Sequence, residues 1–133
     1  MICLDNNLLS DYLAGEAFAK EFLEPYADEV WCVSAVVQYE AMMGACYGHI
    51  SGTISDVEAA TSEFEKVAVT ERTVREATAL QEELSDHGIQ LEARDALIAG
   101  TALEVGAALA TEDGGLHDAG STGLVDVLEY ERP

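Results

Sequence analysis

The chain has 133 residues and a formal net charge of −20, because 26 Asp and Glu residues stand against only 6 Lys and Arg. Its length favours a single domain over residues 1–133, and its 49% hydrophobic residues can build a core, which excludes an acidic disordered tail. The charge excludes the broad basic surface of most nucleic-acid-binding proteins, and no apolar run approaches the roughly 20 residues that a membrane span needs.

The predicted strands and helices alternate along the chain. Short apolar or β-branched runs predict strands, and apolar residues at helical spacing predict the helices between them. Asn6 or Asn7 and Ser34 are expected to cap the helices that follow the first two strands, and a short loop joins the last two strands. In chain order we expect a strand at 2–4, helices at 8–14 and 16–23, a strand at 30–33, helices at 35–47 and 55–66, a strand at 67–69, helices at 71–86 and 93–105, and strands at 107–110 and 124–128.

This order of elements indicates the class of fold. Strands separated by helices pair in parallel through right-handed crossovers, and the helices then cover both faces of the sheet. The sequence therefore predicts an α/β fold, a three-layer α/β/α sandwich with a parallel sheet of about five strands. Such sheets bind ligands at the carboxyl ends of their strands, where the strand order reverses.

The acidic composition has two interpretations. Either the protein acts on cationic partners, or it comes from an organism that accumulates molar salt, where acidic surfaces hold water and charge repulsion is screened. We favour the halophilic interpretation because the acids are spread along the chain and only two lysines are present.

The three cysteines, Cys3, Cys32 and Cys46, form no CxxC motif. Their odd number and the absence of a signal-peptide pattern favour a reducing cytoplasm, so we expect a cytoplasmic protein. Cys3 and Cys32 fall in predicted strands, where we expect buried thiols that pack as small apolar side chains.

Two acidic residues occupy the carboxyl ends of predicted strands. Asp5 follows directly after the first strand, and Asp113 lies just past the fourth. Each residue alone is more typical of a turn or a helix cap, but both lie at the edge where this kind of fold binds ligands.

Two further acids lie in predicted helices. Glu40 is the only formally charged residue between Glu29 and Asp56, in a helix that must be mostly buried, where a carboxylate is unfavourable unless paired, protonated or bound to a cation. The alternative is that Glu40 faces solvent. Asp95 begins the helix at 93–105 on the face expected to pack on the sheet, although a favourable interaction with the helix N-terminus also explains an acid there.

These four carboxylates would converge without a counter-charge. Arg94 precedes Asp95 but is expected to project about 100° away from it on the helix, so no basic side chain is expected beside the acids. Mg²⁺ or Mn²⁺ is the natural counter-ion for hard oxygen ligands, and such a site suits hydrolysis of a phosphodiester.

The chain resembles the PIN-domain ribonucleases, and among them the short VapC-type toxins of toxin–antitoxin pairs, over nearly its whole length. The segments that carry the resemblance are Leu4-Asp5-Asn6-Asn7, the helix-borne Glu40, Arg94-Asp95-Ala-Leu-Ile98-Ala99 and Thr111-Glu112-Asp113-Gly-Gly-Leu116. The chain departs from the family at Asn6, Gly100 and Leu116, and none of these positions is an acid.

The resemblance implies a strand order of 3-2-1-4-5 and a metal-dependent endoribonuclease that acts as the toxin of a toxin–antitoxin pair. It implies a pocket with one or two Mg²⁺ or Mn²⁺ ions, an RNA substrate, a homodimer and a cognate antitoxin that fills the cleft. The expected catalytic and metal-binding residues are Asp5, Glu40, Asp95 and Asp113, the supporting residues are Asn7 and Thr111, and the weaker candidates for substrate contact are Arg94 and His117.

Two alternative functions remain open. A non-catalytic PIN scaffold would keep the fold without the reaction. An acidic phosphoacceptor signalling module would also gather Asp residues at strand ends, but it needs a Lys near the end of a later strand, and neither Lys20 nor Lys66 is expected there.

Overall fold

A computed structural model of residues 1–133 contains one five-stranded parallel sheet. The strands are β1 (Ile2–Leu4), β2 (Trp31–Ser34), β3 (Glu65–Val67), β4 (Ala108–Thr111) and β5 (Val127–Glu129). They lie in the order β3-β2-β1-β4-β5, and every neighbouring pair is parallel. The predicted α/β fold and its strand order are therefore confirmed.

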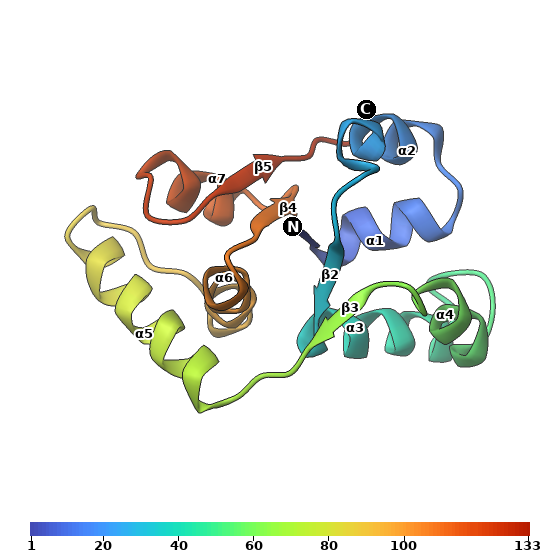
Figure 1. The fold of residues 1–133 in the computed structure, drawn as a ribbon, viewed down its shortest axis with the longest axis horizontal. Coiled ribbons are helices and arrows are strands. Elements are labelled where there is room, and N and C mark those ends of the chain that lie inside the picture. Colours follow the sequence, from blue (N-terminus) through green and yellow to red (C-terminus); the bar gives the residue numbers. More distant parts are fainter.

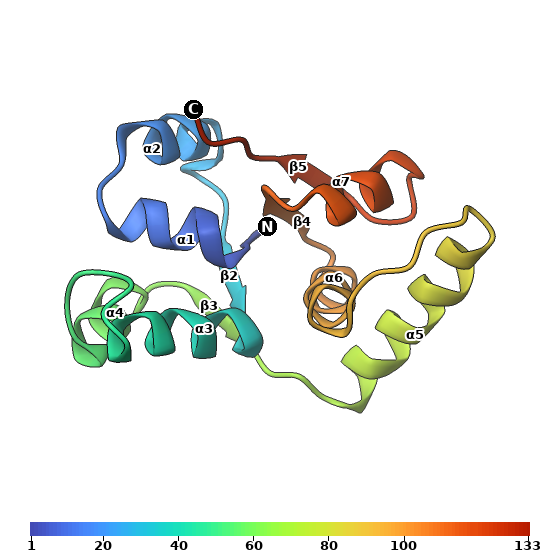
Figure 2. The ribbon, with the colours of Figure 1, turned by 180° about the vertical axis from the view of Figure 1, so that it is seen from behind.

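Helices join the strands and cover both faces of the sheet (Figures 1 and 2). They are α1 (Asn6–Leu13), α2 (Ala17–Leu23), a 3₁₀ turn η1 (Glu24–Tyr26), α3 (Ala35–Cys46), α4 (Ile54–Ala60), α5 (Glu71–Ser85), α6 (Ala93–Val105) and α7 (Gly114–Ser121). Helices α1 to α4 lie on one side of the sheet and α5 to α7 on the other, as right-handed crossovers require when the chain reverses direction across the sheet. None of them combines the length and apolar character of a membrane-crossing helix.

The core lies between the sheet and its two helical layers. Side chains of β1, β2 and β4 are almost all buried, because helices cover these inner strands on both faces. Leu8 and Leu9 of α1 and Leu84 of α5 are also fully buried in this core. Helices α5 and α6 pack closely at Gly100, where a Cβ atom would lie 2.9 Å from the carbonyl oxygen of Thr73, so this position accepts only glycine without a shift.

Two helix starts differ from the predictions because other residues form the caps. Helix α1 begins at Asn6 with Asp5 as its N-cap, whose carboxylate accepts a hydrogen bond from the Asn6 backbone N–H. Helix α4 follows a capping box of Thr53 and Asp56, and it ends at Ala60, well before the predicted residue 66. The following strand, β3, therefore begins earlier than predicted.

The segment predicted as a short loop between the last two strands contains helix α7. Its glycine-rich sequence has low helix propensity, which is why the pattern did not predict it. The helix forms because Asp113 caps it through the Leu116 backbone N–H and because Leu116 and Ala119 are buried. Strand β5 is correspondingly shorter than predicted and begins at Val127.

The prediction of free thiols at Cys3 and Cys32 is wrong, because the two residues form a disulfide. They are register partners on the adjacent strands β1 and β2, with Cα atoms 4.5 Å apart. Cys46 is the remaining free thiol and is exposed. The three cysteines therefore form one disulfide and one free thiol. Their odd number is no longer evidence for a reducing compartment.

Candidate active site

The carboxyl ends of β1 and β4 form the switch point of the sheet. The two strands are neighbours, but the chain leaves β1 into α1 on one face and leaves β4 into α7 on the other (Figures 1 and 2). Divergent connections of this kind leave a crevice at the sheet edge. A pocket of about 430 Å³ opens here without any apolar lining, and its residues are Asp5, Asn6, Asn7, Glu40, Arg94, Glu112, Asp113 and Gly114.

Asp5 is held rigidly at the end of β1. Its Oδ1 accepts hydrogen bonds from the backbone N–H of Asn6 at 2.7 Å and from Nη2 of Arg94 at 2.8 Å, and its Oδ2 accepts one from the Thr111 hydroxyl at 2.7 Å. Only 8% of the side chain is exposed. Two of its three donors are neutral groups of the framework, so the carboxylate keeps its orientation without a cation.

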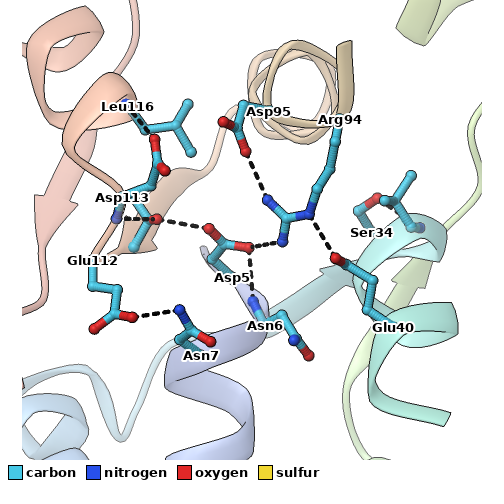
Figure 3. A network of polar contacts seen from close by, with 12 residues as sticks. Asp5, Asn6, Asn7, Ser34, Glu40, Arg94, Asp95, Glu112, Asp113 and Leu116 are labelled. Atoms are coloured by element: carbon cyan, nitrogen blue, oxygen red, sulfur yellow. Dashed lines mark hydrogen bonds and ion pairs between the residues drawn. The ribbon is translucent and has the colours of Figure 1, made fainter. Parts of the chain in front are cut away.

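Asp113 is positioned from β4 through Thr111. The Thr111 hydroxyl that donates to Asp5 also accepts a hydrogen bond from the Asp113 backbone N–H at 3.1 Å. The Oδ2 of Asp113 accepts a bond from the Leu116 N–H at 2.9 Å at the start of α7 (Figure 3). Thr111 therefore links the two acids that follow the central strands.

Glu40 and Asp95 reach the same place from helices on opposite sides of the sheet. Glu40 extends from α3 with a side chain 28% exposed, and Asp95 lies in the first turn of α6 with a side chain 10% exposed. The Oε1 atom of Glu40 and the Oδ1 atom of Asn6 are both buried without a hydrogen-bond partner. Two uncompensated oxygen atoms thus lie on residues that line the pocket.

The prediction that no basic side chain accompanies the acids is wrong, because Arg94 lies among them (Figure 3). Its Nε donates to Glu40 at 2.6 Å, its Nη1 to Asp95 at 2.6 Å and its Nη2 to Asp5 at 2.8 Å. The 100° helical angle sets only the initial direction of the side chain. The Arg94 side chain is long enough to bring its guanidinium back to Asp95 at the N-terminal end of α6.

The charges in this cluster do not balance. The four candidate ligands and the Arg94 guanidinium give a formal charge of 1 − 4 = −3, and Glu112, which also lines the pocket, adds a fifth carboxylate. Burial and the nearby charge of Asp113 raise the pKa of Asp95, although Arg94 opposes this effect. Burial alone would lower the pKa of Arg94, but its contacts with Glu40 and Asp5 outweigh burial and raise it, so the guanidinium stays charged. The pocket keeps an excess of negative charge that favours a further cation.

Glu112 is a pocket residue that the sequence analysis missed. It accepts a hydrogen bond from the side-chain amide of Asn7, and its Oε2 lies 3.6 Å from Nε of Arg132. In a chain with 26 acids, only its position between Thr111 and Asp113 could have singled it out. Asn7 thus contacts the rim of the pocket through Glu112.

His117 lies outside the pocket lining. Its Nε2 is 2.6 Å from the carbonyl oxygen of Thr111. Because a carbonyl only accepts hydrogen bonds, Nε2 carries the proton in this contact. This contact attaches the ring to the end of β4.

An aromatic groove adjoins the acidic pocket. It has a volume of about 450 Å³ and shares Asn6, Asn7 and Glu40 with the pocket. Tyr39 and Tyr47 of this groove are 64% and 70% exposed. These exposed aromatic rings extend the pocket along α3, in a groove that also contains Glu40.

The fold and the site define a class of α/β protein whose acidic pocket lies at the switch point of a parallel sheet. The sequence profile of the PIN domain matches residues 2–121, which is most of the chain. The chain therefore belongs to the PIN domain family. No match was found among curated proteins.

Several solved structures have a similar fold. A toxin–antitoxin complex from Klebsiella pneumoniae has a chain with 26% identity and a TM-score of 0.71, over 85% of this chain and 87% of that one. VapBC2 from Rickettsia felis, bound to a promoter DNA fragment, has 20% identity and a TM-score of 0.76 over 98% and 100% of the two chains. FitAcB from Neisseria gonorrhoeae has 21% identity and a TM-score of 0.74 over 97% of each.

Proposed function

We propose that the protein is a metal-dependent endoribonuclease that hydrolyses RNA phosphodiester bonds at the pocket of Asp5, Glu40, Asp95 and Asp113. The observation that carries this proposal is the gathering of four carboxylates from two strand ends and two helices: Asp5, Glu40 and Asp113 line one open pocket, and Asp95 joins them through its contact with Arg94. Membership of the PIN domain family supports the proposal. A single PIN-like domain over residues 1–133 would contain the whole site.

The residues of the pocket fit Mg²⁺ or Mn²⁺. The donors are hard oxygen atoms, the formal charge is −3 with Arg94 included, and the buried Oε1 of Glu40 lacks a partner. As the side chains stand, no three of the acids form a group that could hold a metal ion, so metal binding requires side-chain movement. A bound divalent ion would supply an activated water and offset the charge that develops on the phosphate.

The remaining residues have supporting roles in this proposal. Thr111 orients Asp5 through its hydroxyl and fixes the backbone of Asp113, so it keeps two ligands at a constant separation. Asn7 positions Glu112 at the rim of the pocket. The exposed rings of Tyr39 and Tyr47 are suited to stacking on the bases of a single-stranded RNA, an interaction that does not depend on basic residues.

We propose that the protein acts as the toxin of a toxin–antitoxin pair in the cytoplasm. The similar structure from Klebsiella pneumoniae is described as a toxin–antitoxin complex, which supports an antitoxin partner for this chain. We expect a homodimer whose pockets are closed by segments of the antitoxin. Co-expression with a small neighbouring reading frame should relieve growth arrest if that frame encodes the antitoxin.

The test is cleavage of RNA by purified protein in molar KCl with Mg²⁺ or Mn²⁺. Replacing Asp5→Asn or Asp95→Asn should lower the cleavage rate on the order of 100-fold or more, because each change removes one anionic ligand. Asp28→Asn is the matched control, since Asp28 is exposed and lies outside the pocket. EDTA should stop cleavage while the circular dichroism spectrum stays unchanged.

Undiminished cleavage by either pocket variant would contradict the assignment of the site. Failure of Mn²⁺ to bind the unaltered protein in a calorimetric titration at high KCl would instead favour a non-catalytic PIN scaffold. The expectation that no lysine lies near the end of a later strand is wrong, because Lys66 lies in β3, one residue from its carboxyl end. The phosphoacceptor alternative still gains no support, because Lys66 donates to the Thr61 carbonyl and neither Lys20 nor Lys66 lines the pocket.

A further inference from the structure

We propose that Arg94 is a built-in counter-ion of the acidic pocket that a divalent cation must displace, so that Arg94 sets the affinity of the site for metal. This inference deepens the proposed function and concerns the same pocket. It begins from the three charged contacts of one guanidinium with carboxylates of β1, α3 and α6 (Figure 3).

Arg94 engages one oxygen atom of each of three candidate metal ligands and leaves Oε1 of Glu40 without a partner. Its Nε, Nη1 and Nη2 each donate to a different carboxylate, those of Glu40, Asp95 and Asp5, at distances of 2.6 to 2.8 Å. One cation thus engages three of the four candidate ligands at once. This arrangement is consistent with the absence of any group of three acids placed to hold a metal ion. A divalent ion and the guanidinium cannot both have these oxygen atoms.

Arg94 is also the most exposed member of the ion-pair cluster. Its side chain is 34% exposed, whereas the side chains of Glu40, Asp95 and Asp5 are 28%, 10% and 8% exposed. Asp5 is additionally held by the Asn6 N–H and the Thr111 hydroxyl. Release of Arg94 into solvent therefore leaves the position of Asp5 intact, while displacement of Asp5 would disrupt the start of α1.

Electrostatics determine the direction of the effect. Without Arg94 the pocket would carry four uncompensated carboxylates, and their repulsion would destabilise the metal-free protein. With Arg94 the metal-free pocket is more stable, but a divalent ion must break the guanidinium contacts and enter a less negative pocket. Arg94 therefore lowers the affinity of the pocket for metal and raises the stability of the metal-free protein.

The test is a calorimetric titration of Mn²⁺ into wild-type protein and Arg94→Gln in molar KCl, with thermal unfolding measured on the same samples. We expect Arg94→Gln to bind Mn²⁺ at least about tenfold more tightly and to unfold at a lower temperature in EDTA. Saturating Mn²⁺ should raise its unfolding temperature more than that of the wild type. Arg94→Lys keeps the charge without the three-way contact and should lie between the two, and it serves if Arg94→Gln does not fold.

The matched control is Arg75→Gln, which removes the same charge from a surface pair with Glu71. It should leave Mn²⁺ affinity within about twofold, because exposed charges far from the pocket are screened in molar salt. Weaker or unchanged Mn²⁺ binding by Arg94→Gln would overturn the inference, as would an equal gain in Arg75→Gln or the absence of Mn²⁺ binding in every variant.

The inference and the proposed function can fail separately. If Arg94→Gln binds Mn²⁺ more tightly but no RNA is cleaved by any form of the protein, the competition stands and the proposed reaction is wrong. If the wild type cleaves RNA in a Mn²⁺-dependent way but the Arg94 variants bind Mn²⁺ as the wild type does, the proposed reaction stands and Arg94 is not the competing cation.

Discussion

Asp11 is the buried acid outside the candidate active site, and its partners come from the far end of the chain. Its carboxylate accepts hydrogen bonds from the Tyr130 hydroxyl at 2.7 Å and from Nε and Nη2 of Arg132 at 2.8 and 2.9 Å. Tyr130 is 1% exposed. These contacts attach the C-terminal segment to α1, on the element that carries Asp5 at its start.

Replacing Asp11→Ala should lower the free energy of unfolding by about 1–3 kcal/mol, because the buried Tyr130 hydroxyl loses its acceptor and Arg132 its bidentate partner. Urea unfolding monitored by circular dichroism measures this change. Asp28→Ala, at an exposed position, is the control and should stay within about 0.5 kcal/mol of the wild type. Equal effects of the two substitutions would contradict the role of the Asp11 cluster.

The same cluster predicts how stability depends on pH. Burial alone would raise the pKa of Asp11, but hydrogen bonds from Arg132 and Tyr130 outweigh it and hold the pKa below its ordinary value of 3.8. Since the folded-state pKa is the lower one, the contribution is present above pH 3.8 and is lost as the pH falls below that value. The difference in unfolding free energy between wild type and Asp11→Ala should therefore be constant from about pH 5 to 8 and shrink below about pH 4.

The alkaline limit follows from Tyr130. Burial and the neighbouring Asp11 raise the pKa of its phenol above the ordinary value of 10.0. A raised folded-state pKa means that the contribution is present below pH 10.0 and is lost as the pH rises above it. Tyr130→Phe should abolish this alkaline loss while it lowers stability at neutral pH.

At the scale of elements, the Cys3–Cys32 disulfide joins β1 and β2, the strand that leads into Asp5 and the strand that leads into α3. It closes a segment with a sequence separation of 29 and is fully enclosed in the core. A cross-link over a loop of this length restricts the unfolded chain. The disulfide therefore holds the two elements that carry Asp5 and Glu40 in fixed register.

Reduction of the disulfide, or the double substitution Cys3→Ala and Cys32→Ala, should lower the free energy of unfolding by about 3–4 kcal/mol. Guanidinium unfolding with and without dithiothreitol measures this loss, and Cys46→Ala should not change it. Thiol titration of the denatured, unreduced protein should find one free thiol, that of Cys46. Three free thiols, or unfolding curves that do not respond to reductant, would contradict the pairing.

At the scale of the whole molecule, few of the acidic side chains behind the charge of −20 are paired with a basic side chain. Of the six basic residues, Arg94 and Arg132 pair with the buried acids of the pocket and of α1, and Arg75 pairs with Glu71 on the surface. Most of the remaining acids therefore repel one another across the surface. Screening shortens the range of this repulsion from about 10 Å at 0.1 M salt to about 3 Å at 1 M.

The unfolding temperature should therefore rise steadily from dilute buffer to molar KCl, because screening relieves repulsion that compaction increases. Thermal melts at increasing KCl concentration measure this rise. A variant with Glu82→Gln, Glu83→Gln and Asp86→Asn, all exposed on or next to α5, should be less dependent on salt. A protein that is equally stable in dilute buffer would leave the acidic surface unexplained and would count against the halophilic interpretation.

The sequence by itself determined the order of the strands and of the helices before β4, the α/β class and the positions of the four acids relative to predicted strand ends. These features depend on local patterns: apolar runs, helical spacing and acids that follow strands directly. Cap residues were less predictable, because several polar residues near Thr53 and Asn6 can cap a helix and only the surrounding packing selects one. Helix α7 was not predicted because its glycine-rich sequence has a poor helix propensity. The helix forms because burial of Leu116 outweighs that propensity.

Only the tertiary structure decided the contacts between residues that are distant in the chain. Arg94 contacts Asp5, 89 positions away, Tyr130 contacts Asp11, 119 positions away, and Cys3 lies beside Cys32 because β1 and β2 pair in register. The physical reason is that the partner of a long side chain, or of a strand, depends on how several elements pack together. No local sequence pattern encodes this packing. The sequence identified the four acids, but it did not show that Arg94 joins three of them.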